Sequence, residues 1–193
     1  MTNRHKRLTL PATLLSALAL ASGSVFADVE KFALQGNTLH IDTDTNDFTV
    51  TAIGNNSFQV TFLTDDSGRP YVNLPSMALP DDAASNQLDI NVSETPNSIT
   101  LTYNDVSATI DKRSHLISYA QNGEVIAKER GGLSISEEGV HLTFTLDENE
   151  RLYGGGQRVL GMDRRGHSMP LYNKAHYGYT TSSNQMYFGL SAV

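Results

Sequence analysis

The sequence of 193 residues contains no cysteine and no tryptophan, and the first absence excludes several kinds of chemistry. Without cysteine there is no disulfide, no thiolate nucleophile and no zinc site built on sulfur. A folded domain of this chain must therefore rest on its hydrophobic core, for which 39% hydrophobic residues are sufficient. The length predicts one ordinary domain, with room for a short processed segment besides.

Basic residues are scarce as well. Lys and Arg number 14 against 21 Asp and Glu, which gives a formal net charge of −7 and a pI near 5.2. Binding to the phosphates of a nucleic acid needs clustered Lys and Arg, and no such cluster occurs outside the extreme N-terminus. We therefore expect no nucleic-acid partner.

The N-terminus has the pattern of a signal peptide. A basic stretch from Arg4 to Arg7 precedes an apolar run over residues 8–21, and small residues lead to Ala27. The apolar run is shorter than the about 20 residues that span a bilayer, which argues against a membrane anchor. We predict a signal peptide over residues 1–27, cleavage between Ala27 and Asp28, and export to the periplasm or the medium of a bacterium, with no membrane association afterwards. Its removal would also take away three Lys or Arg residues and no acid, so the net charge would fall from −7 to −10.

Helical periodicity never dominates the remaining sequence. Apolar residues instead alternate with polar ones, as in strands that bury one face. Asn104-Asp105 and Asn122-Gly123 separate pairs of such runs and predict hairpins, the second with a type I′ turn. An all-β fold, an antiparallel β-sandwich, is therefore predicted. The expected strands are residues 58–62, 88–92, 99–103, 106–110, 116–120, 125–127 and 140–146.

Two segments depart from this pattern. Residues 65–86 carry three prolines and two pairs of acids, and predict a long loop. Residues 186–193 are apolar and predict the start of another strand, after which the sequence stops. Because a sheet edge is normally paired or covered, we expect the sandwich to be incomplete at its C-terminal end.

A motif near the C-terminus resembles a known family. Residues 150–158 read Glu-Arg-Leu-Tyr-Gly-Gly-Gly-Gln-Arg, and Asp163-Arg164-Arg165-Gly166 and Leu171-Tyr172-Asn173 follow. This order resembles the signature of the N-terminal domain in glycoside hydrolase family 31, the α-glucosidase family. The residues that carry the signature are Tyr153, Gly154, Gly156, Gln157, Arg165 and Gly166.

The resemblance implies a fold and a partner. It implies a galactose-mutarotase-like sandwich over residues 28–193, packed against a catalytic (β/α)8 barrel normally in the same chain. The full-length enzymes act on α-linked glucose or xylose units of oligosaccharides with retention of configuration. The resemblance also implies that the loop after the glycine run reaches over the active site of the barrel.

That loop, residues 163–181, is rich in groups that suit sugars. Aromatic faces stack on apolar sugar faces, and amide and imidazole groups pair with hydroxyls. The candidate substrate-binding residues are Asn173, His176, Tyr172 and Tyr177. For the tyrosines, packing between the sandwich and a neighbouring domain is the competing interpretation.

One position departs from the family pattern. Many members carry an Asp two residues after the Asn, where this sequence has Ala175. The variant resembles a bacterial subgroup that holds both α-glucosidases and 4-α-glucosyltransferases, between which the sequence does not decide.

No catalytic residue, metal or cofactor is predicted. Retaining glycosidases need two carboxylates about 5 to 5.5 Å apart; in the family both are aspartates of the barrel, and no segment matches their motifs. The glycine run lacks the spacing of a nucleotide-binding loop. His167 and His176 have no evident third ligand.

The leading hypothesis is therefore a non-catalytic N-terminal domain or fragment of an exported α-glucosidase-type enzyme, which contributes carbohydrate-binding loops. The alternative is a stand-alone carbohydrate-binding sandwich without hydrolase activity. A mutarotase-type epimerase is suggested by fold analogy alone.

Overall fold

The structure is a computed structural model. It describes residues 29–44, 47–54, 56–63, 88–136, 139–173 and 177–190. The predictions for the signal peptide with its cleavage site at Ala27 and Asp28, for the loop over residues 65–86, and for His176 lie outside the described residues.

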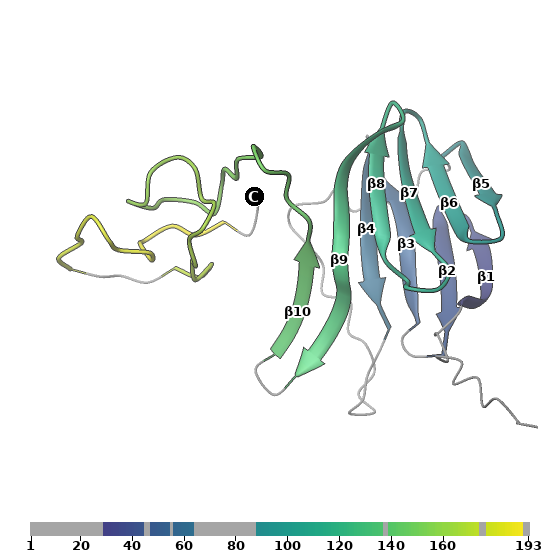
Figure 1. Cartoon of the computed structure of the whole chain (residues 1–193), viewed down its shortest axis with the longest axis horizontal. Helices are drawn as coiled ribbons and strands as arrows, with labels where there is room; N and C mark the ends of the chain where they lie inside the picture. Colours follow the sequence, from purple (N-terminus) through teal and green to yellow (C-terminus); the bar gives the residue numbers. More distant parts are fainter. Residues whose placement is uncertain are drawn as a thin grey trace, which may run out of the picture. The chain divides into compact units, whose positions relative to one another are not determined.

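The described residues form strands and irregular segments, with no helix, and the strands make two antiparallel sheets (Figure 1). One sheet has the order β1-β2-β3-β4 and the other the order β10-β9-β8-β7-β6-β5. This is the predicted all-β sandwich. The strands are β1 (Val29–Gln35), β2 (Thr38–Thr43), β3 (Phe48–Ile53), β4 (Ser57–Phe62), β5 (Ile90–Glu94), β6 (Ser98–Tyr103), β7 (Val106–Asp111), β8 (Ile117–Gln121), β9 (Glu124–Ser136) and β10 (Gly139–Phe144).

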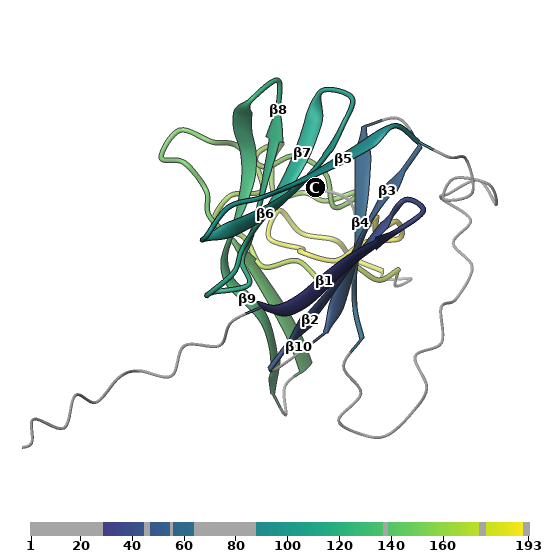
Figure 2. The same cartoon turned by 90° about the vertical axis from the view of Figure 1, so that its right-hand side faces the viewer.

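The chain divides into two compact units, of which the first comprises Met1–Asn104 and Asp111–His115. In this unit the four-stranded sheet and the β5–β6 hairpin share a core. The Tyr103 hydroxyl donates to the carbonyl of Gly54 at 2.7 Å, and the backbone N–H of Leu88 donates to the Asn37 side chain at 3.1 Å. β1, an edge strand, crosses the foreground of Figure 2. The buried side chains are Leu39, Ile41, Phe48, Val50, Ala52, Ile53, Ile99, Leu101 and Tyr103.

The second unit comprises Asp105–Ile110 and Leu116–Val193. Its strands β7 and β8 bury apolar residues, and β8 continues into β9 through the predicted turn. Asn122 and Gly123 have φ values of 51° and 81°, which is the left-handed pair that a type I′ turn requires. The buried apolar side chains of the two strands are Val106, Ala108, Ile110 and Ile117.

A bulge interrupts the pairing of β9 with β10. Leu142 pairs with Leu133, but Phe144 pairs with Glu129, so three residues of β9 lie opposite one residue of β10. Gly132, inside the bulge, has a φ of 60°, which favours glycine. The bulge explains why the alternation over residues 124–136 is less regular than in the other strands.

Most of the predicted strands are confirmed, but the strand predicted from Met186 is wrong for the residues described. Residues 186–190 form no strand. The N–H of Gln157 donates to the carbonyl of Phe188 at 2.9 Å, and the N–H of Leu190 donates to Gly155 at 3.5 Å. These residues thus lie along the glycine run, whose left-handed backbone does not continue a regular ladder.

No helix in the described part of the chain could cross a lipid bilayer.

Candidate functional site

The candidate site lies in the residues that follow β10, which we call the loop segment: residues 145–190, described over 145–173 and 177–190. The described residues of this segment form neither strand nor helix. Figure 1 shows it in green and yellow as a series of irregular loops. Because these residues form no β-ladder, their backbone carbonyls need other hydrogen-bond donors, and arginine side chains supply several of them.

Arg164 is more than nine-tenths buried and binds the glycine run. Its Nε donates to the carbonyl of Gly154 at 3.1 Å and its Nη2 to that of Gly156 at 3.3 Å, while Nη1 donates to the carbonyl of Gly161. One guanidinium therefore joins the glycine run to the backbone at Gly161.

Arg158 is equally buried and joins three different parts of the loop segment. Its Nη1 donates to the carbonyls of Gln157 at 2.6 Å and Phe188 at 2.9 Å. Its Nη2 donates to the carbonyl of Pro170 at 2.6 Å. Carbonyl dipoles thus stabilise its buried charge.

Arg165, a signature residue, fixes the entry to the loop segment. Its Nη1 donates to the carbonyls of Asp147 at 2.6 Å and Glu150 at 2.8 Å. Gly166, which follows it, has a φ of 79°, and a Cβ there would meet no atom within 4 Å. A turn that needs a left-handed residue, rather than a lack of space, accounts for glycine at this position.

Asp163 accepts hydrogen bonds from Arg165, two residues later, and from residues 151–152. Its donors are the N–H of Arg165 at 3.0 Å, the N–H of Leu152 at 3.2 Å and the guanidinium of Arg151 at 2.9 Å. These hydrogen bonds, above all that from Arg165, favour the ionised carboxylate and lower the pKa of Asp163.

The glycine run has the conformation predicted for it. Gly154, Gly155 and Gly156 have φ values of 115°, 72° and 83°. A Cβ at Gly156 would lie 2.6 Å from the carbonyl oxygen of Phe188 and 2.9 Å from the Cα of Gly189. Both reasons for glycine, a left-handed backbone and the close approach of another backbone, therefore apply at Gly156. Of the other signature residues, Tyr153 is exposed, and Gln157 uses its backbone N–H to hold Phe188.

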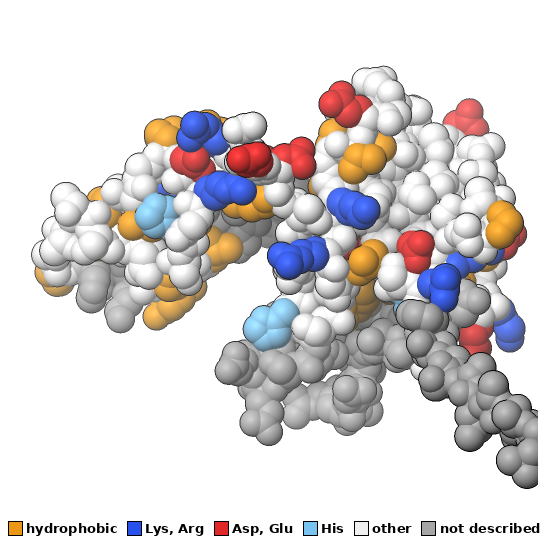
Figure 3. Space-filling model, viewed as in Figure 1, with side chains coloured by type: hydrophobic (Ala, Val, Ile, Leu, Met, Phe, Trp, Pro, Cys, Tyr) orange, Lys and Arg blue, Asp and Glu red, His pale blue; other side chains and the backbone are white. Residues whose placement is uncertain are grey.

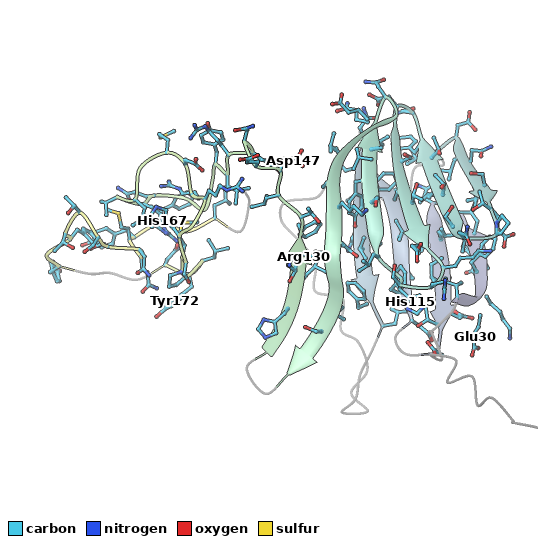
Figure 4. The ribbon with its side chains drawn as sticks, in the orientation of Figure 1. Glu30, His115, Arg130, Asp147, His167 and Tyr172 are labelled. Carbon is cyan, nitrogen blue, oxygen red and sulfur yellow. The ribbon has the colours of Figure 1, made fainter. Side chains whose placement is uncertain are left out.

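The predicted sugar-binding residues that the structure describes are exposed, and hydrogen bonds hold the chain at Tyr172 and Asn173. Tyr172 is 61% exposed and Tyr177 is 95% exposed. The carbonyl of Tyr172 accepts a hydrogen bond from Gln185 Nε2 at 3.2 Å, and the Oδ1 of Asn173 accepts one from the N–H of Gly189. Figure 4 shows the Tyr172 ring pointing outward at the lower edge of the loop segment.

The loop segment and the strand that leads to it also expose many other large apolar side chains, some of which are visible in Figure 3. These are the side chains to which the competing interpretation, packing against a neighbouring domain, applies. The exposed residues are Leu142, Phe144, Leu146, Tyr153, Val159, Met162, Leu171, Tyr172, Tyr177, Tyr187, Phe188 and Leu190.

Glu129 is the one acid that is buried among the described residues. Its Oε2 accepts a hydrogen bond from the N–H of Ile117 at 3.0 Å. Burial raises the pKa of its carboxyl, against the opposing effect of that hydrogen bond. Burial, followed by the charge of Glu129, also raises the pKa of Tyr119. A single buried carboxyl is not the facing pair that a retaining glycosidase uses.

The roles of Arg158 and Arg164 are not evident in the sequence, although both residues stand within the signature. Alternation of polar and apolar residues identifies strands, and it carries no information about a charge buried among carbonyls. The signal that was available is their position beside glycines, in a stretch without alternation, where backbone carbonyls lack strand partners. In the described part of the chain, no group of three or more His, Asp or Glu side chains is placed to hold a metal ion.

Solved structures resemble the fold closely. A dextranase of Flavobacterium johnsoniae, from glycoside hydrolase family 31 and complexed with glucose, superposes with a TM-score of 0.73 at 13% identity, over 84% of this chain and 20% of the dextranase. A cycloalternan-forming enzyme of Listeria monocytogenes, complexed with a pentasaccharide substrate, superposes with a TM-score of 0.62 at 15% identity. The match covers 83% of this chain and 16% of that enzyme. An α-xylosidase of the same hydrolase family from a soil metagenome, complexed with xylose, superposes with a TM-score of 0.60 at 20% identity. The match covers 75% of this chain and 25% of the α-xylosidase.

At these identities the likeness concerns the fold. The chain spans 16% to 25% of the length of these three enzymes. No curated protein matches the sequence. The model of one family matches residues 30–191, which is most of the chain. The chain therefore belongs to the family of glycosyl hydrolase 31 N-terminal galactose mutarotase-like domains.

Proposed function

We propose that this chain is the non-catalytic N-terminal domain of an exported enzyme that acts on α-linked glucose or xylose units of oligosaccharides. In this proposal the loop segment supplies part of the sugar-binding surface. Two observations together carry it. The loop segment exposes aromatic rings, and hydrogen bonds from Arg158 and Gln185 fix the backbone of residues 170–173. Because the backbone that carries the Tyr172 ring is already ordered, ligand binding does not have to order it.

The chemistry of the exposed groups suits a sugar. The faces of Tyr172 and Tyr177 can stack on the apolar face of a pyranose ring. Because Gly189 already occupies the Oδ1 of Asn173, the NH2 group of that amide is the part that would donate to a sugar hydroxyl. The proposal also retains His176 as a contact with sugar hydroxyls. The related enzymes bind glucose, xylose and a pentasaccharide, which supports an α-linked oligosaccharide as the ligand class.

Calorimetric titration of the 193-residue chain with isomaltotriose tests the binding proposal. We expect millimolar affinity, because the domain supplies only part of a binding surface, and we expect Tyr172→Ala to weaken it. Tyr153→Ala is the matched control, since Tyr153 is similarly exposed but lies outside the loop of residues 163–181. Absence of heat at millimolar sugar would refute sugar binding by this domain. Tight binding by the isolated chain would favour the stand-alone binding module instead.

The non-catalytic part of the proposal has a separate test. Retention at an α-glycosidic bond requires a nucleophile and an acid/base, and both are expected on the catalytic domain. The 193-residue chain should therefore release no sugar from a chromogenic α-glucoside or α-xyloside. Turnover clearly above the buffer rate would contradict this.

Export is the third part of the proposal, and it is supported by the sequence of residues 1–27. Expression in a bacterium, followed by N-terminal sequencing of the periplasmic fraction, should give a chain that begins at Asp28. A cytoplasmic chain that keeps residues 1–27 would contradict export.

A further inference from the structure

Arg158 connects the glycine run to the backbone that carries Tyr172. Its guanidinium holds the carbonyl of Pro170, two residues before Tyr172, and at the same time the carbonyl of Phe188. The segment around Phe188 in turn lies against the glycine run through the hydrogen bond from Gln157 N–H. Removal of this guanidinium would therefore break the connection of Pro170 to Phe188 and, through Phe188, to the glycine run.

Two further hydrogen bonds join residues 170–173 to the segment around Phe188. Gln185 binds the carbonyl of Tyr172, and the N–H of Gly189 binds the side chain of Asn173. A Cβ at Gly189 would lie 3.3 Å from both Arg158 Nη2 and Asn173 Oδ1. Arg158 and Asn173 thus flank Gly189 closely, and the two hold residues 170–173 from either end.

We propose that Arg158 is a positioning residue for sugar binding, which holds the backbone of residues 170–173 so that the Tyr172 ring is presented to the ligand. The inference rests on the proposed function, because it assigns a role in the same sugar-binding surface. Arg158 acts through Tyr172 and does not itself contact the sugar. Its planar fork matters, because the single ammonium of a lysine does not reproduce donors fixed toward three carbonyls.

Arg164 provides a matched control. It is as buried as Arg158 and is also bound by carbonyls, but those carbonyls belong to Gly154, Gly156 and Gly161. Loss of Arg164 should therefore loosen the glycine run and the backbone at Gly161 without releasing Pro170. A purely structural role would make the Arg158 and Arg164 variants behave alike.

The test is a double-mutant cycle on the 193-residue chain, with isomaltotriose affinity as the readout. We expect Arg158→Met to weaken binding about tenfold and Arg158→Lys to restore little of it. Since Arg158 acts through Tyr172, Arg158→Met combined with Tyr172→Ala should bind no more weakly than Tyr172→Ala alone. Arg164→Met combined with Tyr172→Ala should show additive effects.

Hydrogen exchange at the amides of residues 171–173 is the second readout, and it needs no sugar. We expect it to rise in Arg158→Met and to stay near the wild-type rate in Arg164→Met, while circular dichroism keeps the strand signal in both. If the wild-type chain binds no sugar, the proposed function fails, and exchange alone decides whether Arg158 holds this backbone. If the chain binds sugar but Arg158→Met and Tyr172→Ala are additive, or exchange is unchanged, the role of Arg158 is overturned.

Discussion

The strands and the loop segment satisfy their backbone groups in different ways. In the strands, carbonyls pair with N–H groups in ladders, and the alternate side chains, such as Leu101 and Ile110, are fully buried. In the loop segment, buried guanidiniums bind the carbonyls, while apolar side chains such as Tyr177 face the solvent. The comparison separates the part of the chain that stabilises the fold from the part for which we propose sugar binding.

The difference follows from what each kind of donor can do. A ladder repeats at every second residue and therefore fixes a regular surface. A guanidinium joins a few carbonyls at arbitrary positions in the sequence, so it can order loops that face a ligand. This leads us to expect that substitutions in the strands change stability, and that substitutions in the loop segment change binding.

The largest expected effect is on the core. Leu101→Ala removes a fully buried side chain of β6 and should lower the free energy of unfolding by about 2–5 kcal/mol. Leu171→Ala, in the loop segment, is the matched control; Leu171 is exposed, so we expect a loss of about 1 kcal/mol or less. Urea unfolding followed by circular dichroism measures both. Equal losses would remove the distinction between the two regions.

The glycine run should give the next largest effect. Gly156→Ala places a Cβ against the carbonyl of Phe188 and adds strain at a φ of 83°, so we expect a loss of about 1–3 kcal/mol. Gly161→Ala has the same backbone strain, at a φ of 86°, but meets no atom within 4 Å. Its loss should be the smaller of the two, as measured by urea unfolding. If both variants lose the same stability, the close approach at Gly156 contributes nothing.

Glu129 in the strands and Asp163 in the loop segment should respond to pH in opposite directions. Burial raises the pKa of Glu129 in β9, so the folded state favours the protonated form, and the contribution of Glu129 to stability is lost as pH rises above the ordinary value of 4.5. Hydrogen bonds lower the pKa of Asp163 in the loop segment, so its contribution is present above 3.8 and is lost as pH falls.

Variants separate these two titrations. Glu129→Gln should flatten the decline of unfolding free energy with rising pH, measured by urea unfolding between pH 4.5 and 8. Asp163→Asn should abolish the acid-induced rise in hydrogen exchange at the amides of Leu152 and Arg165, once the intrinsic pH dependence of exchange is corrected for. A wild-type chain that gains stability as Glu129 ionises would contradict the assignment.

The smallest expected effect on stability is at Tyr177. Its ring is almost fully exposed, so Tyr177→Ala should change the free energy of unfolding by no more than about 0.5 kcal/mol. Isomaltotriose affinity should nevertheless fall, because the ring is proposed to stack on a sugar. Thermal unfolding and calorimetry on the same sample measure the two effects. Unchanged affinity would leave Tyr177 as a packing residue for a neighbouring domain.

Sequence reasoning predicted the strands that bury one face, because alternation is a direct consequence of burial. Residues 99–103 and 106–110 were identified in this way, and the pair Asn122-Gly123 predicted the turn in which it lies. The expected strands did not include β1, most of whose residues are exposed, or β2 and β3. They also fell short of the full length of β9, which a bulge interrupts.

The candidate site was predictable only in part. The glycines were identified because their conformation depends on the residue type alone, and the exposed tyrosines because aromatic residues cluster in one loop. The positions of Arg158 and Arg164 depend on which carbonyls from other parts of the loop segment approach them, at Pro170 and Gly154 for example, and the sequence contains no pattern for such contacts. The strand expected at Met186 failed for the same reason, since these residues pair with the glycine run instead of with a strand.

The most direct test of the account is an isomaltotriose titration of the isotopically labelled 193-residue chain, followed by backbone amide chemical shifts in NMR. The account predicts that the amide shifts of the loop segment near Tyr172 and Tyr177 change progressively as sugar is added, while the amide shifts of β2, β3 and β6 stay constant. Shifts that change only in the strands, or nowhere at millimolar sugar, would contradict it.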